Sequence, residues 1–162
     1  MVGTSTDPMQ FSPNATTTRG MIVTILYRLE GSPDVSGSTN SFSDVSDGTW
    51  YADAVVWAAN SGIISGYGDG LFGPSDTITR EQMLTIVYNY CKWKGIDVSA
   101  GGDINISSYT DGSDVSGWAV PAMQWACGTG AIVGKANGQL DPKLDSTRAE
   151  VAAILDFLES IK

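Results

Sequence analysis

The residues best placed to do chemistry are three arginines, each directly after a threonine at the expected start of a helix. They stand in Thr18-Arg19, Thr79-Arg80 and Thr147-Arg148. The first turn of a helix carries partial positive charge, so a cation there is disfavoured by about 0.3–1 kcal/mol unless an anion offsets it. Three of the chain's four arginines occupy this unfavourable position. We therefore expect an anion next to each of them.

That anion can come from the protein or from a ligand. Within the chain, Asp44, Asp69 and Asp111 are the candidate carboxylates. Alternatively, free N–H groups at a helix start and a planar guanidinium together form a receptor for a ligand carboxylate or phosphate. The two alternatives are compatible, because an arginine fixed by an aspartate can present its other donors to a ligand.

Four tryptophans form two equivalent pairs. Trp57 and Trp125 lie within helical patterns beside small alanines and are predicted to be core residues. Trp50 and Trp118 stand where helices begin, near turns, and can either pack or stack on the apolar faces of sugar rings. Packing is the favoured interpretation for this second pair.

The elements that position these residues are helices predicted from apolar spacing. Each arginine opens a run with four inward positions. Two shorter runs carry the tryptophans, residues 50–60 with Trp50 and Trp57 and residues 118–127 with Trp118 and Trp125. Residues 1–13 are predicted to be a polar loop, and residues 31–41 and 95–108 have linker composition. The inward positions of the three longer runs are Ile22, Ile25, Leu26 and Leu29; Met83, Ile86, Val87 and Tyr90; and Val151, Ile154, Leu155 and Leu158.

These segments form an internal repeat. Residues 50–80 match residues 118–148 at a constant offset of 68, and the Phe-x-Pro and Thr-Arg positions match again near the N-terminus at an offset of 61. The chain thus holds two helix-loop-helix repeats and the second half of another. Such units cannot bury an apolar face alone, so they must pack together, about a pseudo-threefold axis or as a stack. The tryptophan-containing helix of the first repeat is expected from preceding sequence or from a partner chain.

Two of the helix starts carry a capping box. Thr79 with Gln82, and Thr147 with Glu150, have the threonine and the Gln or Glu at the spacing that satisfies two backbone N–H groups reciprocally. The first repeat has Met21 at this place, so a weaker cap is predicted there.

Composition excludes several classes of function. A net charge of −9 argues against nucleic acid, whose binding draws on clustered Lys and Arg. No apolar run is long enough to span a membrane. The chain has no histidine and no Gly-x-Ser-x-Gly motif, and no carboxylate pair stands out as a glycosidase pair. We expect no catalysis, cofactor or metal, and we expect Cys91 and Cys127 to be buried small hydrophobes.

The motifs between Phe42 and Glu81 resemble those of the S-layer homology domain. They are Phe-x-Asp, Trp-x-x-x-Ala, Gly-Ile-Ile-x-Gly-Tyr-x-Asp-Gly-x-Phe-x-Pro and Ile-Thr-Arg-Glu. The resemblance covers nearly the whole chain, as the second half of repeat one in 1–31 and full repeats in 42–95 and 107–162. It implies an all-α fold of helix-loop-helix repeats, a pseudo-threefold spindle around a central helical core.

The resemblance also implies a function and its residues. Domains of this family anchor extracellular proteins to secondary polymers of bacterial cell walls, commonly pyruvylated glycans, through grooves between repeats. The residues that match its functional positions, together with the helix-start tryptophans and the first arginine, are Arg80, Arg148, Arg19, Asp44, Asp111, Gly66, Gly134, Trp50 and Trp118.

Three departures from the family pattern predict fewer than three working grooves. Repeat one lacks its first half, its cluster continues with Gly20-Met21 instead of Ala-Glu, and the third loop begins Lys135-Ala136 instead of Tyr-x. Arg80 and Arg148 are therefore favoured over Arg19.

The resulting hypothesis is a noncatalytic module at the bacterial cell surface that binds acidic wall polysaccharide. The alternative is a protein-interaction or assembly module whose incomplete first repeat is completed by another chain or by self-association. Neither hypothesis involves nucleic acid or a membrane.

Overall fold

Helices make up nearly all the regular structure of the chain. The computed structural model describes residues 5–6, 9–134 and 137–161. Its α-helices are α1 Arg19–Leu29, α2 Ala52–Asn60, α3 Arg80–Lys94, α4 Val120–Gly128 and α5 Arg148–Ser160, and its 3-10 turns are η1 Ile106–Ser108, η2 Gly112–Asp114 and η3 Gly117–Ala119. The predicted all-α fold is confirmed.

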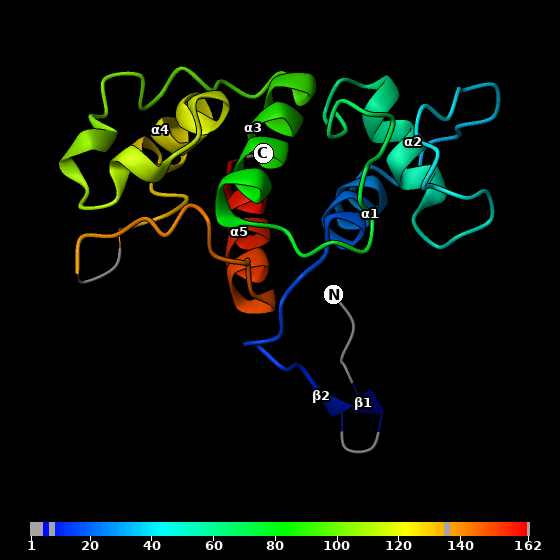
Figure 1. The fold of residues 1–162 in the computed structure, drawn as a ribbon, viewed down its shortest axis with the longest axis horizontal. Coiled ribbons are helices and arrows are strands. Elements are labelled where there is room, and N and C mark those ends of the chain that lie inside the picture. The colour runs from blue at the N-terminus through cyan, green and yellow to red at the C-terminus, as the bar shows by residue number, and fades with distance from the viewer. Residues whose placement is uncertain (1–4, 7–8, 135–136, 162) are drawn as a thin grey trace.

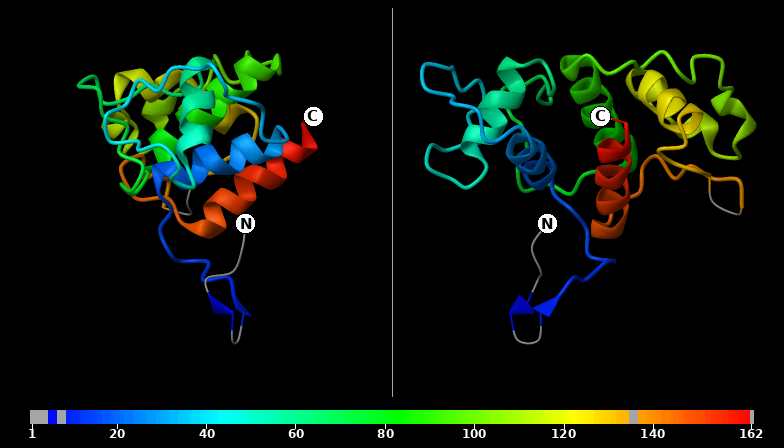
Figure 2. Two further views of the ribbon diagram at one scale, coloured as in Figure 1. Left: turned by 90° about the vertical axis from the view of Figure 1, so that its right-hand side faces the viewer. Right: turned by 180° about the vertical axis from the view of Figure 1, so that it is seen from behind.

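The N-terminal segment differs in detail from the predicted loop. Strand β1, Ser5–Thr6, pairs antiparallel with β2, Met9–Gln10, in a small ribbon that projects from the helical body (Figures 1 and 2). Period-2 alternation cannot show in strands of two residues, so the sequence carried no strand signal. Residues 1–4 and 7–8 of the predicted loop lie outside the described residues, as do Lys135 and Ala136 of the third loop.

The three arginine-led helices occupy the middle of the molecule, and the two tryptophan-containing helices flank them. Helix α2 packs on α1, and α4 packs on α3. Figure 1 shows α2 and α4 at opposite sides of the group formed by α1, α3 and α5. Each flanking helix therefore packs on the central helix of the preceding repeat. A groove between repeats is consequently lined by residues from at least two repeats.

A closed ring of backbone hydrogen bonds joins the three repeats. The Thr17 N–H donates to the Ser146 carbonyl at 2.9 Å, the Ser146 N–H to the Ile78 carbonyl at 2.7 Å, and the Ile78 N–H to the Thr17 carbonyl at 2.9 Å. Each segment donates once and accepts once, which is the pattern of a threefold axis. The pseudo-threefold arrangement is confirmed, and the stack is excluded.

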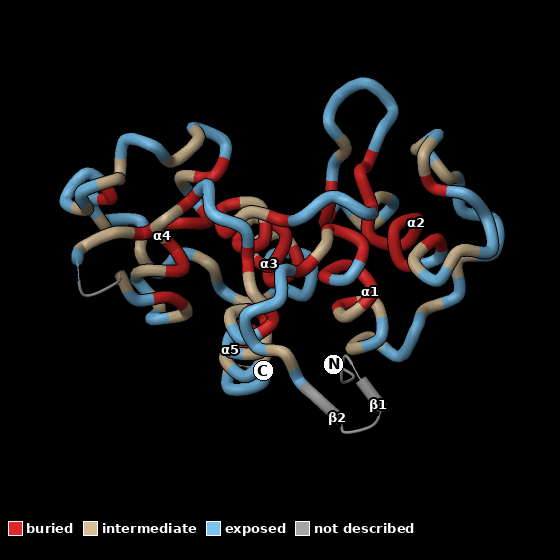
Figure 3. Tube along the Cα trace, turned by 60° about the horizontal axis from the view of Figure 1, so that its bottom comes forward, coloured by how far each residue is buried: buried red, intermediate tan, exposed pale blue. Residues whose placement is uncertain are grey.

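Apolar side chains from all three repeats share one core, with buried stretches on the inward faces of the helices and exposed loops outside (Figure 3). Trp57 and Trp125 are buried as predicted, with 6% and 1% of their surface exposed. Trp125 lies between Tyr88 and Phe157, its ring centroid 5.8 and 5.9 Å from theirs. Trp125 thus links α3, α4 and α5.

The predicted helix caps are present, but the tryptophan-containing helices begin later than expected. Both capping boxes form, and Thr18 of the first repeat accepts only from the Met21 N–H. Trp50 lies in the turn before α2, and Trp118 lies in η3 before α4. The two side chains are 58% and 56% exposed, so the favoured packing interpretation is wrong.

Candidate functional site

Each of the three arginines joins its own repeat to a loop of another. Arg19 Nε donates to the Phe72 carbonyl at 2.7 Å, Arg80 Nε to the Leu140 carbonyl at 2.8 Å, and Arg148 Nε to the Phe11 carbonyl at 2.8 Å. All three side chains are buried. Each guanidinium therefore has a structural partner at Nε, and any ligand must use its Nη groups.

The helix-start N–H groups, predicted to be free for an anion, are already occupied. The first N–H of α3, from Arg80, donates to the Leu144 carbonyl at 2.9 Å, and the second, from Glu81, donates to the Pro142 carbonyl at 3.0 Å. Helices α1 and α5 repeat this pattern with Asp76, Pro74, Ala15 and Pro13 as acceptors. These carbonyls satisfy the unpaired donors of the first turn, which leaves the guanidinium as the anion-binding group.

The aspartates of the Phe-x-Asp motif hold loops instead of pairing with arginines. Asp44 accepts from the Phe72 and Gly73 N–H groups at 2.9 and 2.7 Å. Asp111 accepts in the same way from Leu140 and Asp141, at 2.8 and 2.7 Å. Asp69, the third candidate, accepts from the Leu71 N–H at 3.1 Å in its own turn.

The acid stability of the fold is expected to depend on Asp44. Burial acts to raise the pKa of this carboxyl, but the Phe72 and Gly73 N–H donors, with Arg19 nearby, bring it below the ordinary value. A depressed folded-state pKa contributes stability above the unfolded pKa and loses it as the pH falls through the folded one. Thermal melts of the wild type and Asp44→Asn from pH 7 to pH 2 should therefore converge towards acid. A constant difference at all pH values would contradict this assignment.

A groove of about 390 Å³ lies beside Arg19, within the size range of small-ligand sites. One wall is formed by residues 63–67 of repeat two, which follow α2, and the other by α3. Trp118 of repeat three forms the rim. Its lining residues are Arg19, Ile63, Ile64, Ser65, Gly66, Tyr67, Gln82, Thr85, Ile86, Asn89 and Trp118. All three repeats thus contribute to this site, which we call the Arg19 groove.

Arg19 is held in place by two aromatic rings. Its Cζ lies 4.7 Å from the centroid of Tyr67 and 4.6 Å from that of Phe72. Burial lowers the pKa of Arg19, while Tyr67, Asp76 and Asp44 act in the opposite direction. An arginine in a protein stays charged at neutral pH, so the groove contains a fixed cation whose rotamer is set by its surroundings.

The two motif glycines allow aromatic side chains to pack against the loops. A Cβ on Gly66 would lie 2.4 Å from the Leu71 carbonyl oxygen and 2.6 Å from Phe42 Cε1. On Gly134 it would lie 2.6 Å from Tyr109 Cε1. Only glycine fits at these close approaches, and at Gly66 the exposed backbone forms part of the groove wall.

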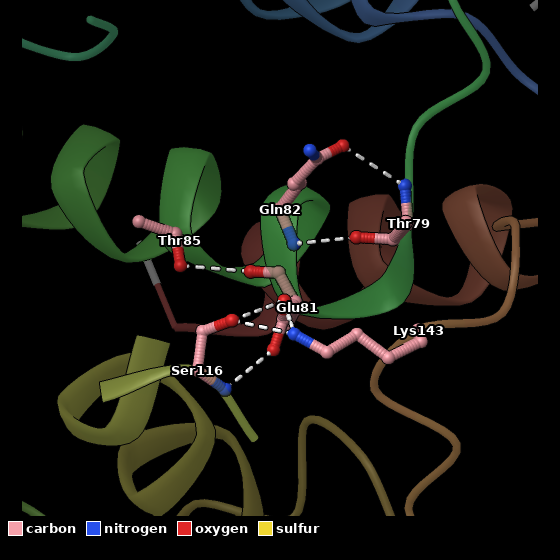
Figure 4. A network of polar contacts seen from close by, with 6 residues as sticks. All are labelled: Thr79, Glu81, Gln82, Thr85, Ser116 and Lys143. Carbon is pink, nitrogen blue, oxygen red and sulfur yellow. Dashed lines mark hydrogen bonds and ion pairs between the residues drawn. The ribbon is translucent and has the colours of Figure 1, made fainter. Parts of the chain in front are cut away.

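A polar network that was not predicted from the sequence holds the chain segment just before Trp118. The buried Glu81 carboxylate accepts from the Ser116 N–H at 2.9 Å and the Ser116 hydroxyl at 2.9 Å, and it pairs with Lys143 Nζ at 2.5 Å (Figure 4). Ser116 lies two residues before Trp118. Glu81 therefore ties the rim of the Arg19 groove to the start of α3.

A second groove, of about 320 Å³, is the pseudo-symmetric counterpart of the first. It is lined by Thr17, Met21, Thr24, Ile25, Arg28, Trp50 and Arg148. Trp50 and Arg148 take the places of Trp118 and Arg19. Among the described residues, none lines this groove in the place of residues 63–67.

The third arginine lies beside a carboxylate. Arg80 Nη1 forms an ion pair with Glu150 of α5. The carboxylate partner expected from the sequence was Asp44, Asp69 or Asp111, and none of these pairs with Arg80. The actual partner comes from a capping box in the next repeat, which spacing along the chain does not bring near Arg80.

The structure thus brings together Arg19, Gly66 and Trp118 from the predicted set, and separates Arg80, Arg148, Trp50 and Gly134 from them. Tyr67, Thr85 and Asn89 also line the Arg19 groove and were not predicted. Helical spacing would have placed Gln82, Thr85 and Asn89 on one face of α3, but nothing in the sequence showed that this face meets Arg19.

Comparison with known proteins gives an independent test of the family. The S-layer homology domain model matches residues 41–84 and 108–152. An amylopullulanase of Thermoanaerobacterium thermosulfurigenes is 35% identical over 146 residues, which are 90% of this chain and 8% of the relative. The chain therefore spans only a small part of such a protein.

Two further relatives carry names that describe surface location. A cellulosome-anchoring protein of Acetivibrio thermocellus is 29% identical over 150 residues, 90% of this chain and 32% of the relative. A surface-layer 125 kDa protein of Lysinibacillus sphaericus is 30% identical over 150 residues, 89% of this chain and 12% of the relative. In the part of the chain that the structure describes, no helix is long and apolar enough to cross a membrane. The predicted cell-surface location is confirmed, and the chain belongs to the S-layer homology domain family.

Proposed function

We propose that the chain is a noncatalytic module that attaches proteins to the bacterial cell wall by binding an acidic, pyruvylated polysaccharide in the Arg19 groove. The observation that carries this proposal is the meeting of a fixed cation, an exposed tryptophan and a polar helix face in one groove. The names of the anchoring and surface-layer relatives support the attachment role.

The groove chemistry suits a carboxylated sugar. The Nη groups of Arg19 provide charge-assisted donors for a carboxylate. Thr85 and Asn89 also line the groove and donate to the Glu81 and Ile63 carbonyls, so their side-chain oxygens are the groups offered to sugar hydroxyls. Trp118 provides an aromatic face for the apolar side of a sugar ring. In a chain with a net charge of −9, this local cation is needed to offset repulsion of an acidic polymer.

Trp118→Ala is expected to weaken binding of purified wall polysaccharide by about tenfold, equivalent to about 1.4 kcal/mol, with no loss of stability. Trp50→Ala is the matched control, because Trp50 is equally exposed and stands at the equivalent position of repeat two. It should weaken binding less, since no described residue lines its groove in the place of residues 63–67. Isothermal titration calorimetry with each variant measures both effects.

The role of the acidic substituent is tested with polymer from which pyruvate has been removed by mild acid. Removal should cost the wild-type protein at least as much affinity as Trp118→Ala. Equal affinity for treated and untreated polymer, or an unchanged Trp118→Ala titration, would refute the proposed site.

A further inference from the structure

Each of the three arginines lies near the third residue of another arginine-led helix. This third residue is different at each of the three sites. Arg19 shares its groove with Gln82 of α3, and Arg148 shares its groove with Met21 of α1. Arg80 contacts Glu150 of α5. Gln82, Met21 and Glu150 are equivalent in the internal repeat, at offsets of 61 and 68. The pseudo-threefold axis thus presents each arginine with a different neighbour: neutral polar, apolar or acidic.

Glu150 uses its two carboxylate oxygens for different purposes. Oε2 accepts from the Thr147 N–H at 2.8 Å and completes the capping box, while Oε1 pairs with Arg80 Nη1. The Arg80 side chain is 8% exposed and that of Glu150 is 28% exposed. The ion pair is therefore partly shielded from water, and the guanidinium group that would bind an external anion already holds an internal one.

Gln82 forms the same cap in α3, but its side-chain amide has a single acceptor atom, Oε1. Its Oε1 accepts from the Thr79 N–H at 3.2 Å, which leaves the Nε2 amide as a donor on the other side of the side chain (Figure 4). The groove lined by Gln82 and Arg19 therefore gains a second donor where the Arg80 site gains an acceptor. Arg19 has no ion pair with a carboxylate among the described residues.

We propose that the residue at this third helical position determines which grooves accept an acidic ligand, with Gln82 keeping the Arg19 groove open and Glu150 closing the Arg80 site as an internal anion. Gln82 is then a specificity-determining residue and Glu150 an autoinhibitory one. The polysaccharide part rests on the proposed function, but the closure of Arg80 by Glu150 does not depend on which ligand binds.

The first experiment uses sodium pyruvate as a carboxylate probe and follows the Nε–H signals of the four arginines by NMR. In the wild type, pyruvate should shift the Arg19 signal and leave the Arg80 signal in place. Glu150→Gln should make the Arg80 signal respond, because glutamine keeps the cap, as Gln82 does in α3. A response of Arg80 in the wild type, or none in Glu150→Gln, would overturn the proposal.

The reciprocal experiment closes the intact groove. Gln82→Glu should lower wall-polysaccharide affinity at least tenfold and abolish the Arg19 response to pyruvate, while the fold persists because α5 already has this capping box with glutamate. Gln82→Met, which copies repeat one, removes the amide donor but adds no charge, so it should weaken binding less than Gln82→Glu does. Lys92→Gln makes the net charge more negative by the same one unit, at an exposed position of α3 outside the groove lining. It should lower affinity much less if pairing with Arg19, and not general repulsion, is the cause.

The outcomes separate the two proposals. If Trp118→Ala weakens polymer binding and Gln82→Glu does not, the third-position rule fails and the binding site stands. If neither variant affects the polymer but the pyruvate responses follow the rule, the rule stands and the polysaccharide site fails.

Discussion

Arg19→Ala is expected to lower the affinity for wall polysaccharide by about a hundredfold, or about 2.8 kcal/mol. Hydrogen bonds to a charged group contribute about 1.5–3 kcal/mol each, and this variant removes the only guanidinium in the groove with Trp118 and Gly66. Calorimetric titration of the polymer into the variant, at fixed ionic strength, gives the change directly.

Arg80→Ala separates binding from stability. Arg19→Ala and Arg80→Ala each lose an Nε bond to a loop carbonyl, to Phe72 in the first and to Leu140 in the second, so both should destabilise the fold. Arg80→Ala also leaves Glu150 unpaired, yet it should change polymer affinity by less than threefold. Equal losses of affinity in the two variants would mean that the arginines act only through the fold.

Trp125→Ala is expected to reduce the free energy of unfolding by about 3–5 kcal/mol, the range for deleting a large buried aromatic side chain. Trp125 is 1% exposed and packs on Tyr88 of α3 and Phe157 of α5, so its loss leaves a cavity where two repeats meet. Urea unfolding followed by circular dichroism measures the change.

Trp118→Ala is the matched control for that measurement. It removes the same side chain seven residues earlier, where it is exposed, and should change the free energy of unfolding by less than about 0.5 kcal/mol. A large loss in Trp118→Ala, or a small one in Trp125→Ala, would show that the two tryptophans exchange the roles given to them here.

The fold could be predicted from the sequence because its signals are local and repeated. The spacing of Thr79 and Gln82 specifies a cap through contacts three residues apart, and the same pattern at Thr147 confirms it in a second context. The repeat itself implied that the units pack on one another. The repeat alone left a threefold set and a stack open, and the family resemblance implied the threefold spindle. The contacts between Thr17, Ile78 and Ser146 that confirm it are encoded by no local pattern.

The candidate site was only partly predictable, because each groove combines residues from different repeats. The first Thr-Arg cluster looked weakest, since it continues with Gly20-Met21. In space, however, Arg19 faces the complete loop and helix of repeat two, and Met21 faces Arg148. The quality of a cluster along the chain therefore says little about the quality of the groove to which its arginine belongs.

The tryptophan rim illustrates the same limit. Trp50 and Trp118 have equivalent sequence positions and nearly equal exposure. Only Trp118 follows a serine held by a buried glutamate, whereas the positions equivalent to Ser116 and Glu81 in the preceding repeat are Gly48 and Gly20. Glu81 belongs to the Ile-Thr-Arg-Glu motif but Ser116 belongs to none, so only the structure shows that the two side chains meet.

The ring formed by Thr17, Ile78 and Ser146 has a mechanical consequence. In an open array of repeats each unit contacts only its neighbours, so tension can peel units away one after another from an end. In this ring each segment holds one neighbour and is held by the other. Pulling any one segment away breaks two of the three bonds at once, so the load is shared around the axis, as suits the proposed role in attachment to a cell wall.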